Sequence, residues 1–154
     1  MVLSVRASSR LLLAAALGAA FGALGQTAAG EMASIRDGVF TAEQARRGRI
    51  AYTGPCDRCH GFKLDGAPDD PDMLPAPPVA GPKFLRKWNG RSLAALFEYT
   101  RATMPANNPA YLSDSEVADI LAYMLSASGM PAGDRGLPAE PAALASIVIV
   151  SQSP

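Results

Sequence analysis

Histidine and cysteine are scarce in this chain of 154 residues, which contains one histidine and two cysteines. Neither sign of charge is in excess, because 14 acidic side chains balance 14 basic ones and the formal net charge is +0. A nucleic-acid binder carries a basic excess, and a disordered chain combines high net charge with low hydrophobicity, so neither class fits this composition. The length predicts one globular domain.

Long apolar runs are also missing, except for one from Leu11 to Leu24 that follows a start with two arginines and no acid. This pattern predicts a secretory signal peptide over residues 1–25, cleaved near Gly25. The run is shorter than the roughly 18–20 residues that a transmembrane helix needs, so we expect no integral membrane span in the mature form. The mature protein is therefore expected in an oxidising compartment, the periplasm.

The segments after this leader predict helices. Thr41, with a glutamine three residues later, has the pattern of a capping box and begins a helix that runs to about Tyr52. Two further helices are expected over residues 93 to about 100 and 114 to about 126, each with an N-terminal serine cap and apolar residues at helical spacing. The proline-rich segment 63–82 is predicted to be irregular. The fold class is therefore predicted to be all-α.

The three scarce ligand side chains all lie in one pentapeptide, Cys56-Asp57-Arg58-Cys59-His60. A thiol redox motif with this spacing is usually set in a β-α-β pattern, which the sequence lacks. A structural zinc site needs four protein ligands, and here Asp or Glu would have to complete the set. Covalent haem attachment requires two cysteines separated by two residues and followed by histidine, and this requirement is met. We therefore favour a haem c attached through Cys56 and Cys59, with His60 on the iron.

An electron carrier usually has a second axial iron ligand, and methionine is the natural candidate in a chain without a second histidine. After the leader the candidates are Met32, Met73, Met104, Met124 and Met130. Met124 lies on the apolar stripe of the last predicted helix and is expected in the core. Met104 lies between two predicted helices, and the proline that follows it favours an extended backbone. We predict Met104 as the second ligand.

Four stretches of the chain resemble class I c-type cytochromes: VFTAEQARRGRIAY, CDRCHG, FLRKWNGRSLAALFEYTRATMP and YLSDSEVADILAYMLSASGMPAG. The resemblance implies a cytochrome c domain over residues 38–136, preceded by a polar extension at 26–37. The tail at 137–154 departs from the family pattern, and the sequence assigns it no role.

The resemblance also implies the class I cytochrome c fold, in which the N-terminal and C-terminal helices cross around one covalent haem. Gly48 and Tyr52 on the first helix are then expected to meet residues such as Leu121 and Tyr123 on the last.

Further haem contacts are implied by the same resemblance. Pro78 resembles the position whose backbone carbonyl holds the N–H of the iron-ligating histidine, and Trp88 resembles the aromatic donor to a haem propionate. Several basic side chains are expected to pair with propionates, to form a docking face, or simply to be solvated; these are Lys83, Arg86, Lys87 and Arg91.

The function that the resemblance implies is that of an electron carrier and not an enzyme. One haem would pass single electrons between redox proteins, such as a dehydrogenase donor and an oxidase or another cytochrome as acceptor. The stretch from Met104 through the last helix is also similar to cytochromes that accompany quinoprotein alcohol dehydrogenases, so an obligate dehydrogenase subunit is an alternative. A haem-based ligand sensor is a third possibility, and it would need an open iron position.

Overall fold

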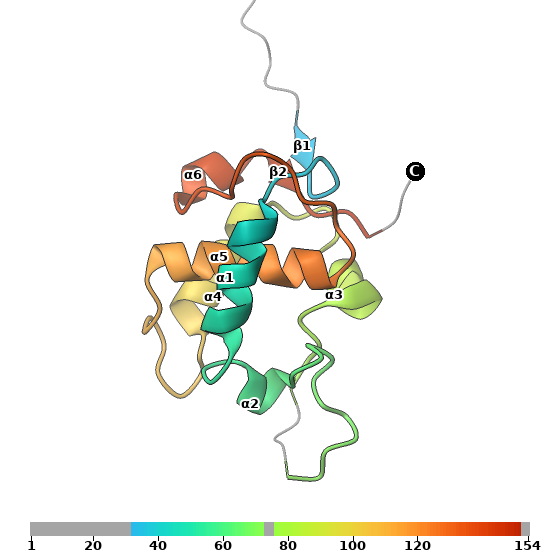
Figure 1. Cartoon of the computed structure of the whole chain (residues 1–154), viewed down its shortest axis with the longest axis vertical. Coiled ribbons are helices and arrows are strands. Elements are labelled where there is room, and N and C mark those ends of the chain that lie inside the picture. The colour runs from blue at the N-terminus through green and yellow to red at the C-terminus, as the bar shows by residue number, and fades with distance from the viewer. Residues whose placement is uncertain (1–31, 73–75, 152–154) are drawn as a thin grey trace, which may run out of the picture.

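A computed structural model of the protein describes residues 32–72 and 76–151. These residues form helices α1 (Ala42–Tyr52), α2 (Asp57–His60), α3 (Gly81–Trp88), α4 (Leu93–Thr103), α5 (Asp114–Ala127) and α6 (Pro141–Leu144), and strands β1 (Ala33–Ser34) and β2 (Ile147–Val148). Figure 1 shows α1 crossing α5, with α2 at one end of the molecule and the two strands at the other. The predicted all-α class is confirmed, with this short strand pair as an addition.

The contact between α1 and α5 is close because α1 carries a glycine at the crossing. A Cβ on Gly48 would overlap the carbonyl oxygen of Asp119, so only glycine allows this separation of the helices. On one side of the crossing the Arg47 guanidinium makes two hydrogen bonds to the Asp119 carboxylate, at 2.8 and 2.9 Å. On the other side the rings of Tyr52 and Tyr123 meet edge to face, with centroids 5.5 Å apart. The expected crossing is confirmed.

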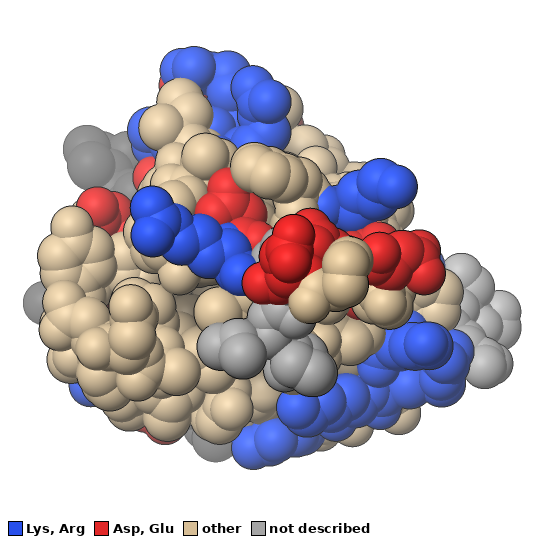
Figure 2. Space-filling view, turned by 90° about the horizontal axis from the view of Figure 1, so that it is seen from below, with Lys and Arg blue, Asp and Glu red and all other residues tan. Residues whose placement is uncertain are grey.

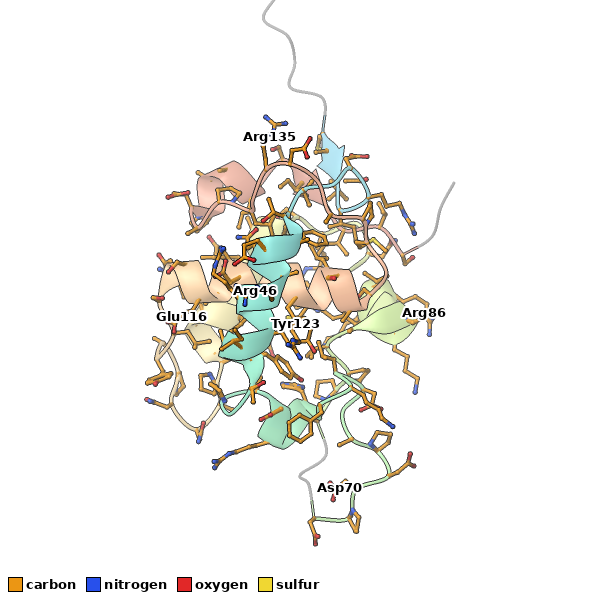
Figure 3. The ribbon with its side chains drawn as sticks, viewed as in Figure 1. Arg46, Asp70, Arg86, Glu116, Tyr123 and Arg135 are labelled. Atoms are coloured by element: carbon orange, nitrogen blue, oxygen red, sulfur yellow. The ribbon has the colours of Figure 1, made fainter. Side chains whose placement is uncertain are left out.

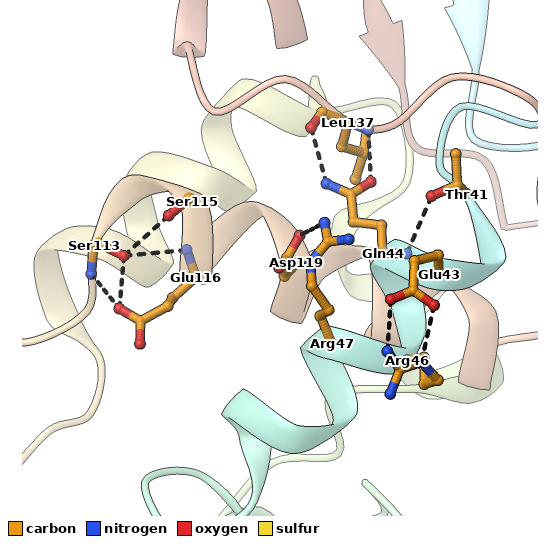
Figure 4. Close-up of polar contacts among 10 residues, drawn as sticks. All are labelled: Thr41, Glu43, Gln44, Arg46, Arg47, Ser113, Ser115, Glu116, Asp119 and Leu137. Carbon is orange, nitrogen blue, oxygen red and sulfur yellow. Dashed lines mark hydrogen bonds and ion pairs between the residues drawn. The ribbon is translucent and has the colours of Figure 1, made fainter.

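The predicted caps of α1 and α5 are present (Figure 4). Thr41 Oγ1 accepts a hydrogen bond from the Gln44 N–H at 3.1 Å, and Ser113 with Glu116 forms a complete capping box. The Gln44 side chain has a different use from the one we predicted. Its amide pairs with both backbone groups of Leu137, donating to the carbonyl at 2.9 Å and accepting from the N–H at 2.7 Å. This pair links α1 to the C-terminal segment.

Helix α3 was not predicted from the sequence. Pro82 lies in its first turn, where proline begins a helix and does not break one, because the first N–H groups have no partner within the helix. The inner face of α3 is buried and its outer face carries three exposed cations, Lys83, Arg86 and Lys87. Helix α4 also runs further than predicted, to Thr103, and ends where the residue before Pro105 must leave the helical region.

The N-terminal extension and the C-terminal tail pair with one another. β1 and β2 are parallel, with Ala33 opposite Ile147 and Ser34 opposite Val148. The tail also contributes to the hydrophobic core, since Leu137, Leu144, Ile147 and Ile149 are all buried. These apolar residues explain why a segment with no assigned role folds back onto the helices: leaving them in water would cost about 25 cal/mol per Å² of apolar surface.

The core lies where the helices meet, and its largest fully buried side chains are Phe40, Phe84, Phe97, Ile35, Leu93, Ile120, Leu121, Leu125, Leu144, Ile149 and Val117. Met124 is buried among them, as predicted. Among the helices of the described residues, none has the length and apolar character needed to cross a bilayer.

Candidate haem site

The pentapeptide folds into one helical turn at the end of the molecule opposite the strands. Cys56 is the residue that precedes α2, and its carbonyl accepts from the N–H groups of Cys59 at 3.1 Å and His60 at 2.9 Å. Residues three apart on a helix share a face, so this turn brings the two thiols to one side of it. No disulfide joins the thiols; Cys56 is half-buried and Cys59 is exposed.

The electrostatics of Cys56 do not suit a thiol redox centre. Burial, followed by the charges of Asp57 and Cys59, raises the pKa of the Cys56 thiol to about 11. A dithiol oxidoreductase needs the opposite shift, because the thiolate is the nucleophile. Among residues 32–72 and 76–151, no three His, Cys, Asp or Glu side chains come together in a group that could bind a metal ion.

His60 is oriented by a backbone carbonyl. Its Nδ1 lies 2.8 Å from the carbonyl oxygen of Pro77. Because a carbonyl oxygen can only accept, Nδ1 carries the proton, and Nε2 keeps its lone pair for a metal. The fixed tautomer and ring plane are those that an iron-ligating imidazole needs.

The carbonyl comes from Pro77, which corrects our expectation that Pro78 would supply it. The reason is the register of the returning chain. Leu64 O accepts from the N–H groups of Val79 at 2.8 Å and Ala80 at 3.3 Å, and these two bonds set which carbonyl reaches the histidine.

Further hydrogen bonds hold the pentapeptide on both sides. Before it, Gly54 N–H donates to the buried Asp57 carboxylate at 2.9 Å. After it, the Tyr52 hydroxyl donates to Gly61 O at 2.9 Å, and burial raises the pKa of this phenol well above its usual range, so it remains a donor. Sequence reasoning missed the roles of Tyr52 and Asp57, because neither residue belongs to the attachment pattern.

Two glycines allow the loop after α2 to close beside His60. Gly61 and Gly66 both have positive φ, at 75° and 84°, which side chains rarely tolerate. Gly66 N–H donates to His60 O at 2.9 Å, and a Cβ at Gly66 would overlap the carbonyl oxygen of Ala76. The loop that carries Asp65, Asp69, Asp70 and Asp72, called the acidic loop below, therefore begins and ends against the histidine.

Met104 directly follows α4 with an extended backbone, φ −118° and ψ 147°, in agreement with the geometry predicted from the following proline. Its side chain is half-buried, whereas Met32 is exposed and both Met124 and Met130 are buried. Met73 lies outside the described residues. Among the methionines that the structure describes, Met104 combines partial burial with a loop position.

Trp88 ends α3 and is 4% exposed. The Arg91 guanidinium lies over its ring, 4.3 Å from the centroid, and Tyr99 packs against it edge to face at 5.6 Å. The indole is thus held between a cation and a second aromatic ring.

A cavity of about 520 Å³ opens between the Pro78 segment and the first turn of α3. Lys63, Lys83 and Arg86 contribute to its lining, and the residues of the pentapeptide do not.

Comparison with known families decides the class of the protein. The family model described as "Cytochrome C oxidase, cbb3-type, subunit III" matches residues 43–124, which span α1, the pentapeptide and most of α5. The chain belongs to this cytochrome c family. Together with the Cys56–Cys59 pair, membership indicates a covalently bound haem c and a role as an electron carrier. No curated protein and no solved structure matches the chain.

Proposed function

We propose that this cytochrome carries single electrons on one haem c that is bound through Cys56 and Cys59, with His60 and Met104 as the axial ligands. The observation that carries the proposal is the donor set: an imidazole held at Nδ1 beside two unpaired thiols on one helical turn. When bound, the haem supplies the one-electron Fe(III)/Fe(II) couple.

The chain's own residues prepare the site for that group. The Pro77 carbonyl polarises the Nδ1–H of His60, which makes Nε2 a stronger ligand for iron. Tyr52 and Asp57 anchor the turn, so the thiols and the ring keep a fixed relation. Met104 would offer a soft, neutral thioether. A thioether stabilises Fe(II) relative to Fe(III) more than a harder oxygen ligand does.

The surroundings of the haem are proposed to include Pro78 and Trp88. Trp88 is the only tryptophan of the chain and is buried at the end of α3, which supports a role in the haem environment over a role in partner contact. Pro78 follows the carbonyl that holds His60, so it would lie near the same side of the site.

The setting is proposed to be the periplasm, after removal of residues 1–25, with the cytochrome domain over 38–136. The support is the apolar run from Leu11 to Leu24, which follows two arginines and no acidic residue, as in a secretory signal peptide. The redox partners would then be a dehydrogenase as donor and an oxidase or another cytochrome as acceptor. The similarity of the stretch from Met104 onward to dehydrogenase-associated cytochromes supports that choice of donor.

Docking is proposed to use the exposed cations of α3, Lys83, Arg86 and Lys87, with Arg91 after the helix. Figure 2 views the molecule from the end that carries α2 and shows a row of basic side chains beside a group of acidic ones. In Figure 3, Asp70 lies at the outer end of the acidic loop and Arg86 projects from α3. Neighbouring charges of opposite sign would orient a partner during encounter as well as attract it.

The experiment is the spectrum of the exported protein, followed by substitution of the axial methionine. A haem that survives acid-acetone extraction confirms the thioether bonds, and its loss overturns them. Met104→Ala should keep the covalent haem, lower the reduction potential and allow carbon monoxide to bind the reduced protein at neutral pH. Met130→Ala is the matched control: it should also keep the covalent haem, but it should neither lower the reduction potential nor allow carbon monoxide to bind. Carbon monoxide binding by the unmodified protein would favour a ligand sensor.

A further inference from the structure

The C-terminal tail runs along the turn between α3 and α4. Gly90 N–H donates to Ile149 O at 2.8 Å, and Ile149 N–H donates to Arg91 O at 2.9 Å. Ser151 N–H donates to the Asn89 side-chain oxygen at 2.8 Å. Three of the four residues of the turn, 89–91, are therefore hydrogen-bonded to the tail, and the fourth, Ser92, forms an isolated antiparallel bridge with Val148.

The same segment is held on its other side by the N-terminal extension. Val148 O accepts from the Ile35 N–H at 3.0 Å, next to the parallel β1–β2 pair. The side chains of Ile35 and Ile149 are both 0% exposed. Figure 1 shows β1 and β2 side by side. The tail thus lies between β1 and the turn, and it cannot shift without breaking hydrogen bonds and exposing apolar surface.

The turn that the tail holds is the one that carries Trp88 and Arg91. Trp88 is the last residue of α3, directly before the turn, and the Arg91 guanidinium lies 4.3 Å from the centroid of its indole. The Arg91 carbonyl is itself the acceptor of the Ile149 N–H. The backbone of the tail therefore contacts Arg91 directly, and the Arg91 side chain contacts the indole.

We propose that the C-terminal segment Ile147–Ser151 is a positioning element for Trp88 and Arg91 and thereby sets the reduction potential of the haem. This inference rests on the proposed function, in which Trp88 borders the haem. Solvent access and nearby polar groups are among the properties that tune haem potentials. Loosening the turn admits water, which stabilises the more highly charged oxidised iron, so the potential falls.

The test uses two substitutions in the full-length holoprotein. Ile149→Pro removes the N–H that donates to Arg91 O, because proline has no backbone donor. Asn89→Ala is milder and removes only the acceptor of the Ser151 N–H. The matched control is Gln44→Leu, which removes the pair of hydrogen bonds to Leu137 and so loosens the same tail far from the turn.

Two readouts separate positioning from general loss of stability. The first is the reduction potential from a spectroelectrochemical titration. The second is the tryptophan fluorescence yield of the holoprotein, which is low while the indole lies beside the haem and reports on one site because the chain has a single tryptophan. We expect Ile149→Pro to raise the fluorescence yield toward that of the denatured chain and to lower the reduction potential. Asn89→Ala should do both to a smaller extent. Gln44→Leu should lower the melting temperature and leave both readouts unchanged.

Two results would overturn the inference: an unchanged fluorescence yield and reduction potential in a folded Ile149→Pro holoprotein, or equal changes in Gln44→Leu. If Ile149→Pro does not accumulate, Asn89→Ala decides alone, and wild-type values for it are the negative result. Failure of the proposed function has a different signature, since the unmodified protein would then yield no haem that survives acid-acetone extraction.

Discussion

Replacing Gly48 by alanine tests how close α1 and α5 must lie. The added Cβ would overlap the backbone carbonyl of Asp119, which cannot rotate away as a side chain could. Alanine gains about 1 kcal/mol over glycine in helix propensity. Overpacking in a close contact costs about 1–3 kcal/mol. Because the atom in the way belongs to the backbone, we expect a cost at the upper end of this range. We therefore expect Gly48→Ala to lower the free energy of unfolding by about 2 kcal/mol.

The assay is guanidinium unfolding of the holoprotein, followed by circular dichroism, with a thermal scan in parallel. A loss of this size corresponds to a fall of about 4–8 °C in melting temperature for a domain of this length. Arg49→Ala is the control, because this exposed residue lies on the same helix and its replacement should change stability by no more than about 0.5 kcal/mol. If Gly48→Ala were as stable as the unmodified protein, the argument that the helices need glycine at the crossing would be refuted.

Three further predictions concern the haem and its partners. Cys56→Ala combined with Cys59→Ala should abolish holoprotein and leave a largely unfolded chain, because a domain stable by about 5–15 kcal/mol does not survive loss of the haem from its interior. A cooperative thermal transition of native size in this variant would contradict the prediction. Lys83→Gln with Lys87→Gln should slow association with an acidic redox partner without changing the visible spectrum, and rising salt should slow the unmodified protein in the same way; an association rate that is flat with ionic strength points instead to apolar docking. Met124→Ala should cost about 2–5 kcal/mol through a core cavity without opening the iron to carbon monoxide, and carbon monoxide binding by this variant would count against Met104 as the ligand.

The features that could be predicted from the sequence are those that depend on neighbouring residues. The thiol–thiol–imidazole spacing lies within five consecutive residues, and the caps at Thr41 and Ser113 depend on contacts three residues apart. The extended backbone of Met104 follows from the proline after it. Local chemistry of this kind is readable without coordinates, because its cause is steric and lies inside the segment.

The contacts that join distant segments could not be predicted from the sequence and are seen only in the folded chain. The Gln44 amide pairs with Leu137, 93 residues away, where local pattern predicted a capping box. The carbonyl that holds His60 belongs to Pro77 and not Pro78, because the hydrogen bonds of Leu64 set the register of a loop. Nearly every residue carries the same backbone N–H and C=O groups, so the sequence does not show which of these groups a distant side chain will contact. The packing of the whole chain determines these pairs.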